Sequence, residues 1–189
     1  MSPDGSFAIS PRSRVVIYTL GRFEVVLEGV PLRFKGRAPV RALELLSALI
    51  AAGGRGVSVA SLSDSLWPEA DGFDAYRAFT TTLHRLRRLL LCPEAVRLCA
   101  GRLTLDAQLC RVDLWEFERS LRAARDVAAL HEALDMYHGP FMGDDPSPWS
   151  ISMRARLEKL VAGARSRFAT PQPRPSNLLS GGLEFAAFA

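Results

Sequence analysis

Residues 75–90, AYRAFTTTLHRLRRLL, carry an apolar stripe along one side of a segment long enough for about four helical turns. At about 100° per residue, Leu83, Leu86 and Leu90 all point within about 40° of Phe79. The opposite side collects basic and hydroxyl-bearing side chains with no acid, namely Arg77, Thr80, Thr81, His84, Arg85 and Arg88. A helix that is only solvated usually mixes charge signs and gains from ion pairs four residues apart. This pattern requires a fold that buries one face, and it indicates a polyanion partner for the other.

The net charge of +4 is unevenly distributed along the 189 residues. Residues 1–110 hold 14 Arg and Lys against 10 Asp and Glu, whereas residues 111–189 hold 10 of each. The segment 76–102 contains six arginines and a single acid, Glu94. Such a local surplus is typical of a surface that binds a polyanion, although a solvated helix face is the alternative. Arginine supplies 22 of the 24 cations, which suits paired contacts to phosphate or guanine.

The apolar periodicity around this helix changes between that of strands and that of helices. Residues 14–34 combine a Val- and Ile-rich run with period-two alternation, which predicts a small antiparallel sheet of about three strands. Residues 37–54 and 57–68 each predict a core-facing helix, ended by a glycine pair and by a proline. Residues 96–110 predict a hairpin that turns at 100–102. The predicted order is sheet, helix, helix, basic helix and hairpin.

The rest of the chain predicts helices between two irregular ends. Residues 111–168 contain three amphipathic segments, the first of which begins at Asp113, a residue type that caps helices. Residues 1–13 are small and polar and residues 169–189 are rich in Pro, Ser and Gly, so we expect a disordered lead and a loose tail. No apolar run approaches the ~18 residues that span a bilayer, and the start lacks the pattern of a secretory signal. We therefore expect a cytoplasmic protein.

Residues of the types that carry catalysis or bind metals are scattered. Cys92, Cys99 and Cys110 are odd in number and lack zinc-finger spacing. His131 and His138 lie seven residues apart with no third metal ligand that the sequence places beside them. The glycine-rich phosphate-binding loops and the GxSxG motif of hydrolases are missing from the sequence. We therefore expect no metal, no cofactor and no enzymatic activity.

Taken in order, four stretches resemble the winged-helix output domain of the OmpR type, in the version found in the Streptomyces antibiotic regulatory proteins. They are LGRFEVVLEGVPLRF (20–34), LELLSALIAAGGRGVSVASLSDSLWPEAD (43–71), AFTTTLHRLRRLL (78–90) and GRLTLD (101–106). Residues 110–121 and 137–160 resemble the start of the bacterial transcriptional activator domain, a helical module similar to tetratricopeptide repeats. That module continues for several more helices in the family, whereas about three are predicted here.

The resemblance implies an α+β fold in two parts. Residues 14–110, the winged-helix part, would form a winged helix-turn-helix with an N-terminal antiparallel sheet and a C-terminal hairpin. Residues 111–168, the helical part, would form a partial all-α segment similar to tetratricopeptide repeats. Because that module is incomplete, we expect an exposed apolar groove where further helices would pack.

The resemblance also implies a site and a function. Helix 75–90 becomes a recognition helix for the major groove of double-stranded DNA, with residues 96–110 as the wing. Arg85 is the first candidate for a base contact, and Arg77, Arg88 and the wing residue Arg102 are candidates for phosphate contacts. The remaining candidate contacts on the outer face of the helix are Thr80, Thr81 and His84.

The implied protein is a sequence-specific regulator of transcription, whose helical part mediates self-association or contacts other regulator domains. The alternative is an interaction or oligomerisation module whose winged helix does not read DNA.

Overall fold

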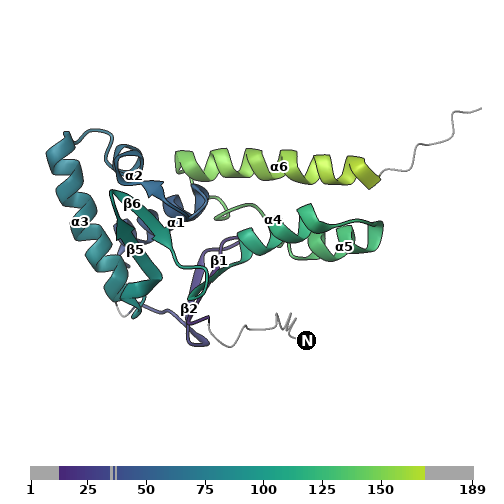
Figure 1. Ribbon diagram of the computed structural model, residues 1–189, viewed down its shortest axis with the longest axis horizontal. Coiled ribbons are helices and arrows are strands. Elements are labelled where there is room, and N and C mark those ends of the chain that lie inside the picture. Colours follow the sequence, from purple (N-terminus) through teal and green to yellow (C-terminus); the bar gives the residue numbers. More distant parts are fainter. Residues whose placement is uncertain (1–12, 35, 37, 169–189) are drawn as a thin grey trace, which may run out of the picture.

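The structure, a computed structural model, describes residues 13–34, 36 and 38–168. These residues form an α+β fold of two small sheets and six α-helices (Figure 1). The elements follow the predicted order of sheet, helices, hairpin and further helices. The expected lead and tail lie outside the described residues, apart from Ser13.

The first sheet contains the three predicted strands and one more. Strands β1 (Val15–Tyr18), β2 (Glu24–Leu27) and β3 (Val30–Pro31) pair antiparallel in chain order. Strand β7 (Cys110–Val112) then adds to the free edge of β1 in the parallel direction, which gives the order β3-β2-β1-β7. The sheet is therefore mixed, and the prediction of an antiparallel sheet is wrong at this edge. A strand of three residues is too short for its alternation to be recognised in the sequence.

The next three helices contribute to the core, with the first of them at its centre. They are α1 (Val40–Ala51), α2 (Val59–Leu66) and α3 (Gly72–Leu89). Every residue of α1 from Leu45 to Ile50 is buried, because α2, α3, α6 and the second sheet all pack around this helix. Helix α3 begins three residues before the predicted start at 75, since the Asp71 carboxylate accepts a hydrogen bond from the Asp74 N–H at 2.9 Å.

The second sheet contains the predicted hairpin. After a short 3₁₀ turn, η1 (Pro93–Ala95), strands β5 (Val96–Cys99) and β6 (Arg102–Leu105) pair antiparallel, and β4 (Val57–Ser58) joins the other edge of β6. The wing predicted over 96–110 therefore ends at Leu105, because Cys110 belongs to the first sheet.

The helical part packs against the winged-helix part. Its helices are α4 (Asp113–Ala123), α5 (Val127–Asp135) and α6 (Pro148–Phe168). Figure 1 shows α6 lying along α4 and α5, with its first turns beside α1. There the Trp149 indole N–H donates to the Ser47 hydroxyl at 3.2 Å. Phe117 and Leu157 belong to one buried cluster with the apolar residues of α1.

Within residues 111–167, the structure does not show the expected exposed apolar groove. Among the described residues of this part, Val127 and Ile151 are the large apolar side chains that are exposed. The other large apolar side chains between residues 111 and 167 are buried or half-buried, because the three helices pack on one another and on α1. Three helices therefore suffice to cover this end of the core.

Candidate nucleic-acid interface

Packing fixes which side of α3 faces outward. Phe79, Leu83 and Leu86 are buried against α1 and α2, as the apolar stripe predicts. Leu90, the residue that follows the last turn, is buried as well. Turning the helix about its axis would remove these side chains from the core, at a cost of about 2 kcal/mol for each fully buried leucine. The orientation of the outer face is therefore a consequence of the core.

The outer face of α3 presents the predicted side chains to solvent. All six residues singled out on the sequence are exposed, namely Arg77, Thr80, Thr81, His84, Arg85 and Arg88. Arg87 lies on the flank, where its guanidinium donates to the Val96 carbonyl at 2.9 Å and joins α3 to the hairpin. Figure 1 shows α3 at one end of the molecule, far from α4 and α5, so the helical part leaves this face open.

Arg77 and Thr80 make local contacts that affect this face near the start of α3. The Arg77 guanidinium lies 3.7 Å from the Asp74 carboxylate, and its Cζ atom is 5.9 Å from the centre of the Phe73 ring. With the Arg77 side chain 70% exposed, this ion pair is weak and leaves the guanidinium accessible. The Thr80 hydroxyl donates to the Tyr76 carbonyl at 2.9 Å, so only its oxygen lone pairs remain for a ligand.

Arg102, the arginine of the wing, does not lie at the tip of the hairpin as predicted. Ala100 and Gly101 form the tip of the hairpin, both with positive φ, as a tight two-residue turn requires. Arg102 is the first residue of β6, and its guanidinium donates to the Gly56 carbonyl at 2.8 Å. This bond directs the side chain toward the segment before β4 instead of outward from the tip. The side chain is nevertheless exposed.

A groove beside α3 contains a residue that the sequence did not single out. Arg41, in the first turn of α1, lines this groove together with Arg77, Thr81 and Arg85. The groove has a volume of about 460 Å³, and Trp67, at the end of α2, forms part of its floor. The Arg41 guanidinium is held by Glu44 at 3.0 Å. Nothing in the local sequence marks Arg41, because the groove exists only where three helices meet.

The other chemistry-bearing residues do not come together into a site. Cys92 and Cys110 are buried, whereas Cys99 is exposed on β5. Burial raises the pKa of the Cys110 thiol to about 12. In the part of the chain that the structure describes, no group of three or more His, Cys, Asp or Glu side chains is placed to hold a metal ion. Within the same residues, every helix is too short or too polar to cross a bilayer.

The fold is of the winged-helix type, with an attached helical part. It contains three helices, of which the third projects a basic face, and a two-stranded hairpin lies beside them. A search with the sequence finds no matching family model. The same sequence matches no curated protein.

Among solved structures, the fold is similar to that of Mycobacterium tuberculosis EmbR in complex with a low-affinity phosphopeptide, with a TM-score of 0.59 and 20% sequence identity. The alignment covers 81% of this chain and 44% of the EmbR chain, so the protein spans less than half the length of that neighbour. At this identity the similarity establishes a shared fold.

Proposed function

We propose that the protein is a sequence-specific DNA-binding regulator of transcription. The observation that carries this proposal is the outer face of α3, where Arg77, Arg85 and Arg88 are exposed on a helix that the core holds in one orientation. Like charges so placed repel one another, and a DNA backbone offsets that cost. The only nearby acid among the described residues of α3 is Asp74, at the end of this face. The function is binding rather than catalysis, and it would be exercised in the cytoplasm.

In the proposed complex α3 lies in the major groove. Arg85 is placed near the middle of the exposed face and is our candidate for a paired contact to guanine. Arg77 and Arg88 flank it along the helix and would bind phosphates, with Thr81, Thr80 and His84 completing the surface. Arg41 of α1, which is paired with Glu44, lines the protein groove beside α3 and would contact the DNA backbone there. Arg102 reaches DNA only if its bond to Gly56 is exchanged for a phosphate.

The proposal is tested by reversing two charges on this face. Duplexes bound by the full chain are first selected from a random pool, and the Arg85→Glu/Arg88→Glu double variant is then compared in gel shifts. We expect the variant to lose at least ~100-fold in affinity, since each lost base or phosphate contact costs about 1–3 kcal/mol. With ~4–5 phosphates neutralised, the wild-type log affinity should fall against log salt with a slope of about −4.

The matched control reverses two exposed arginines of the helical part, Arg125→Glu and Arg165→Glu, which make no ion pair with the described residues. This control changes the net charge equally and should bind within about threefold of the wild type, because the removed charges lie away from α3. If both double variants weaken equally, or if no duplex is enriched, α3 does not read DNA. The helical part, as a surface for self-association or for other regulator domains, would then be the functional one.

A further inference from the structure

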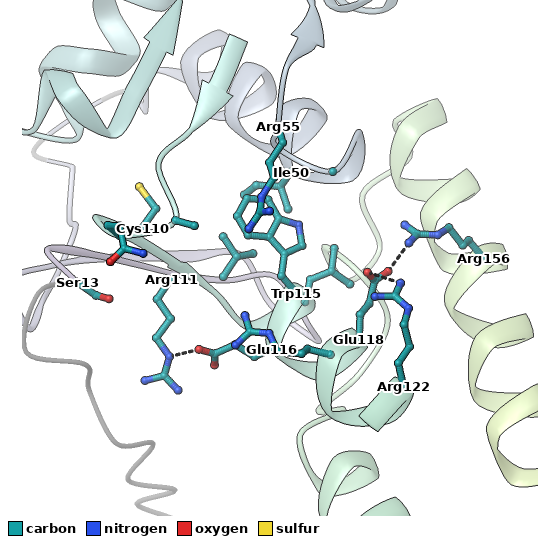
Figure 2. Close-up of a pocket in the computed structure, with 16 residues that line it drawn as sticks. Ser13, Ile50, Arg55, Cys110, Arg111, Trp115, Glu116, Glu118, Arg122 and Arg156 are labelled. Carbon is teal, nitrogen blue, oxygen red and sulfur yellow. Dashed lines mark hydrogen bonds and ion pairs between the residues drawn. The ribbon is translucent and has the colours of Figure 1, made fainter. Parts of the chain in front are cut away.

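A second basic feature lies at the junction of the winged-helix and helical parts. A pocket of about 470 Å³ opens there (Figure 2). Its walls come from the loop after α1, from β7, from α4 and from α6. We call it the arginine pocket after its five arginines, Arg55, Arg111, Arg119, Arg122 and Arg156.

The arginine pocket has an excess of positive charge that its own acids do not balance. Among the described residues, Glu116 and Glu118 are the acids that line it, so five guanidinium groups against two carboxylates leave a formal charge of +3. Because the pocket is concave and lined by protein on several sides, this charge is screened less than the same charge on a flat surface. An anion with about three negative charges would neutralise it.

Ion pairs hold three of the five guanidinium groups in place. Arg111 pairs with Glu116 at 2.5 Å on one side of the pocket. On the other side the buried Glu118 carboxylate accepts a hydrogen bond from Arg122 at 2.9 Å and lies 2.6 Å from Arg156, paired by charge without a well-aligned hydrogen bond. Figure 2 shows Trp115 between these two groups, with Arg55 above its ring. These ion pairs therefore position the guanidinium groups of Arg111, Arg122 and Arg156 around the opening.

Two guanidinium groups of the pocket are not used within the described residues. Arg55 and Arg119 make no ion pair and no side-chain hydrogen bond there. The guanidinium groups of Arg55 and Arg119 are therefore available to a ligand in the pocket.

We propose that the arginine pocket binds a small oxyanion with about three negative charges, through phosphate or carboxylate groups. Guanidinium groups bind both kinds of group through paired hydrogen bonds, and the volume falls in the range of sites for small molecules. The pocket shares no lining residue with the groove beside α3, so the two are separate surfaces. The ligand joins Arg55 of the winged-helix part to Arg119 and Arg156 of the helical part, and so connects the two.

Calorimetric titration of the full chain tests the proposal with two probes of similar charge and different chemistry, pyrophosphate and citrate, at one ionic strength and pH 7.5. We expect saturable one-to-one binding of at least one probe, accompanied by a higher melting temperature. The Arg55→Gln/Arg119→Gln variant, in which no ion pair with the described residues is lost, should bind at least tenfold more weakly. The stronger probe identifies the ligand as a phosphate or a polycarboxylate.

The control variant is Arg125→Gln/Arg165→Gln, which removes two exposed arginines outside the pocket and should bind each probe within twofold of the wild type. The proposal is overturned if neither probe binds, or if the pocket variant binds as tightly as the wild type. Equal losses in the two variants would also overturn it, since they would indicate net charge alone. Duplex binding by the pocket variant should remain unchanged, so failure here is distinct from failure of DNA reading.

Discussion

At Gly54, backbone conformation and packing both act against a side chain. Its φ of +70° lies in the left-handed region, and a Cβ atom there would be 2.2 Å from Cζ2 of Trp115. Its carbonyl accepts from the Leu105 N–H at 2.7 Å, which fixes the segment against the hairpin. We expect Gly54→Ala to lower the free energy of unfolding by about 3 kcal/mol, through backbone strain and displacement of the indole. Urea denaturation followed by circular dichroism measures the change.

Gly163 provides the opposite case on the same chain. It lies within α6, and a Cβ atom added there meets nothing within 4 Å. Gly163→Ala should therefore raise the free energy of unfolding by up to about 1 kcal/mol, because alanine is the better helix former. If both variants lost a similar amount of unfolding free energy, the indole of Trp115 would not lie close to Gly54 in solution.

Single residues also show where sequence reasoning reaches its limit. The exposure of Arg85 was predictable, because the side of a helix on which a residue lies follows from its spacing to the apolar stripe. The bond from Arg102 to Gly56 was not, since it joins residues 46 positions apart. Arg41 was missed for the same reason, because only the packing of α1 beside α3 brings it into the groove.

Among the elements, the junction between β1 and α4 depends on one carboxylate. The sequence predicts Asp113 as a cap of the helix that it begins. In the structure its side chain instead accepts from the Thr19 N–H at 2.8 Å, from the Thr19 hydroxyl at 2.7 Å and from the Leu20 N–H at 3.0 Å. A local motif could not reveal this role, because the donors lie more than 90 positions earlier. The contact attaches the first helix of the helical part to the first sheet.

Replacing this carboxylate should therefore cost more than removing an ordinary helix cap. Asp113→Ala leaves the buried donors of Thr19 and Leu20 unpaired, and we expect a loss of about 3 kcal/mol in unfolding free energy. The comparison is Asp126→Ala, which removes the cap of α5, an exposed bond to the Ala129 N–H at 2.8 Å, and should cost about 1 kcal/mol. Urea midpoints of the two variants give the comparison directly, and equal costs would show that Asp113 serves as a simple cap.

At the scale of the whole molecule, the described residues share one buried core. The order of elements and the basic helix were predictable from periodicity, which is a local property. That the two parts share one core was not predictable, because it depends on β7 pairing with β1 and on α6 packing against α1. A boundary at residues 110 and 111 would cut through β7 and leave one edge of β1 without its hydrogen-bonding partner.

This arrangement predicts that the winged-helix and helical parts unfold together. Leu46 of α1 and Leu157 of α6 are both fully buried in the same cluster, and Leu→Ala at either site should cost about 2–5 kcal/mol. Because neither part can lose its share of the core alone, each variant should shift one common urea transition, equally by far-UV circular dichroism and by tryptophan fluorescence. A second transition that moves in Leu157→Ala and stays fixed in Leu46→Ala would instead show that the helical part unfolds independently. A single transition would mean that a ligand which stabilises the junction between the two parts also stabilises the framework that orients α3.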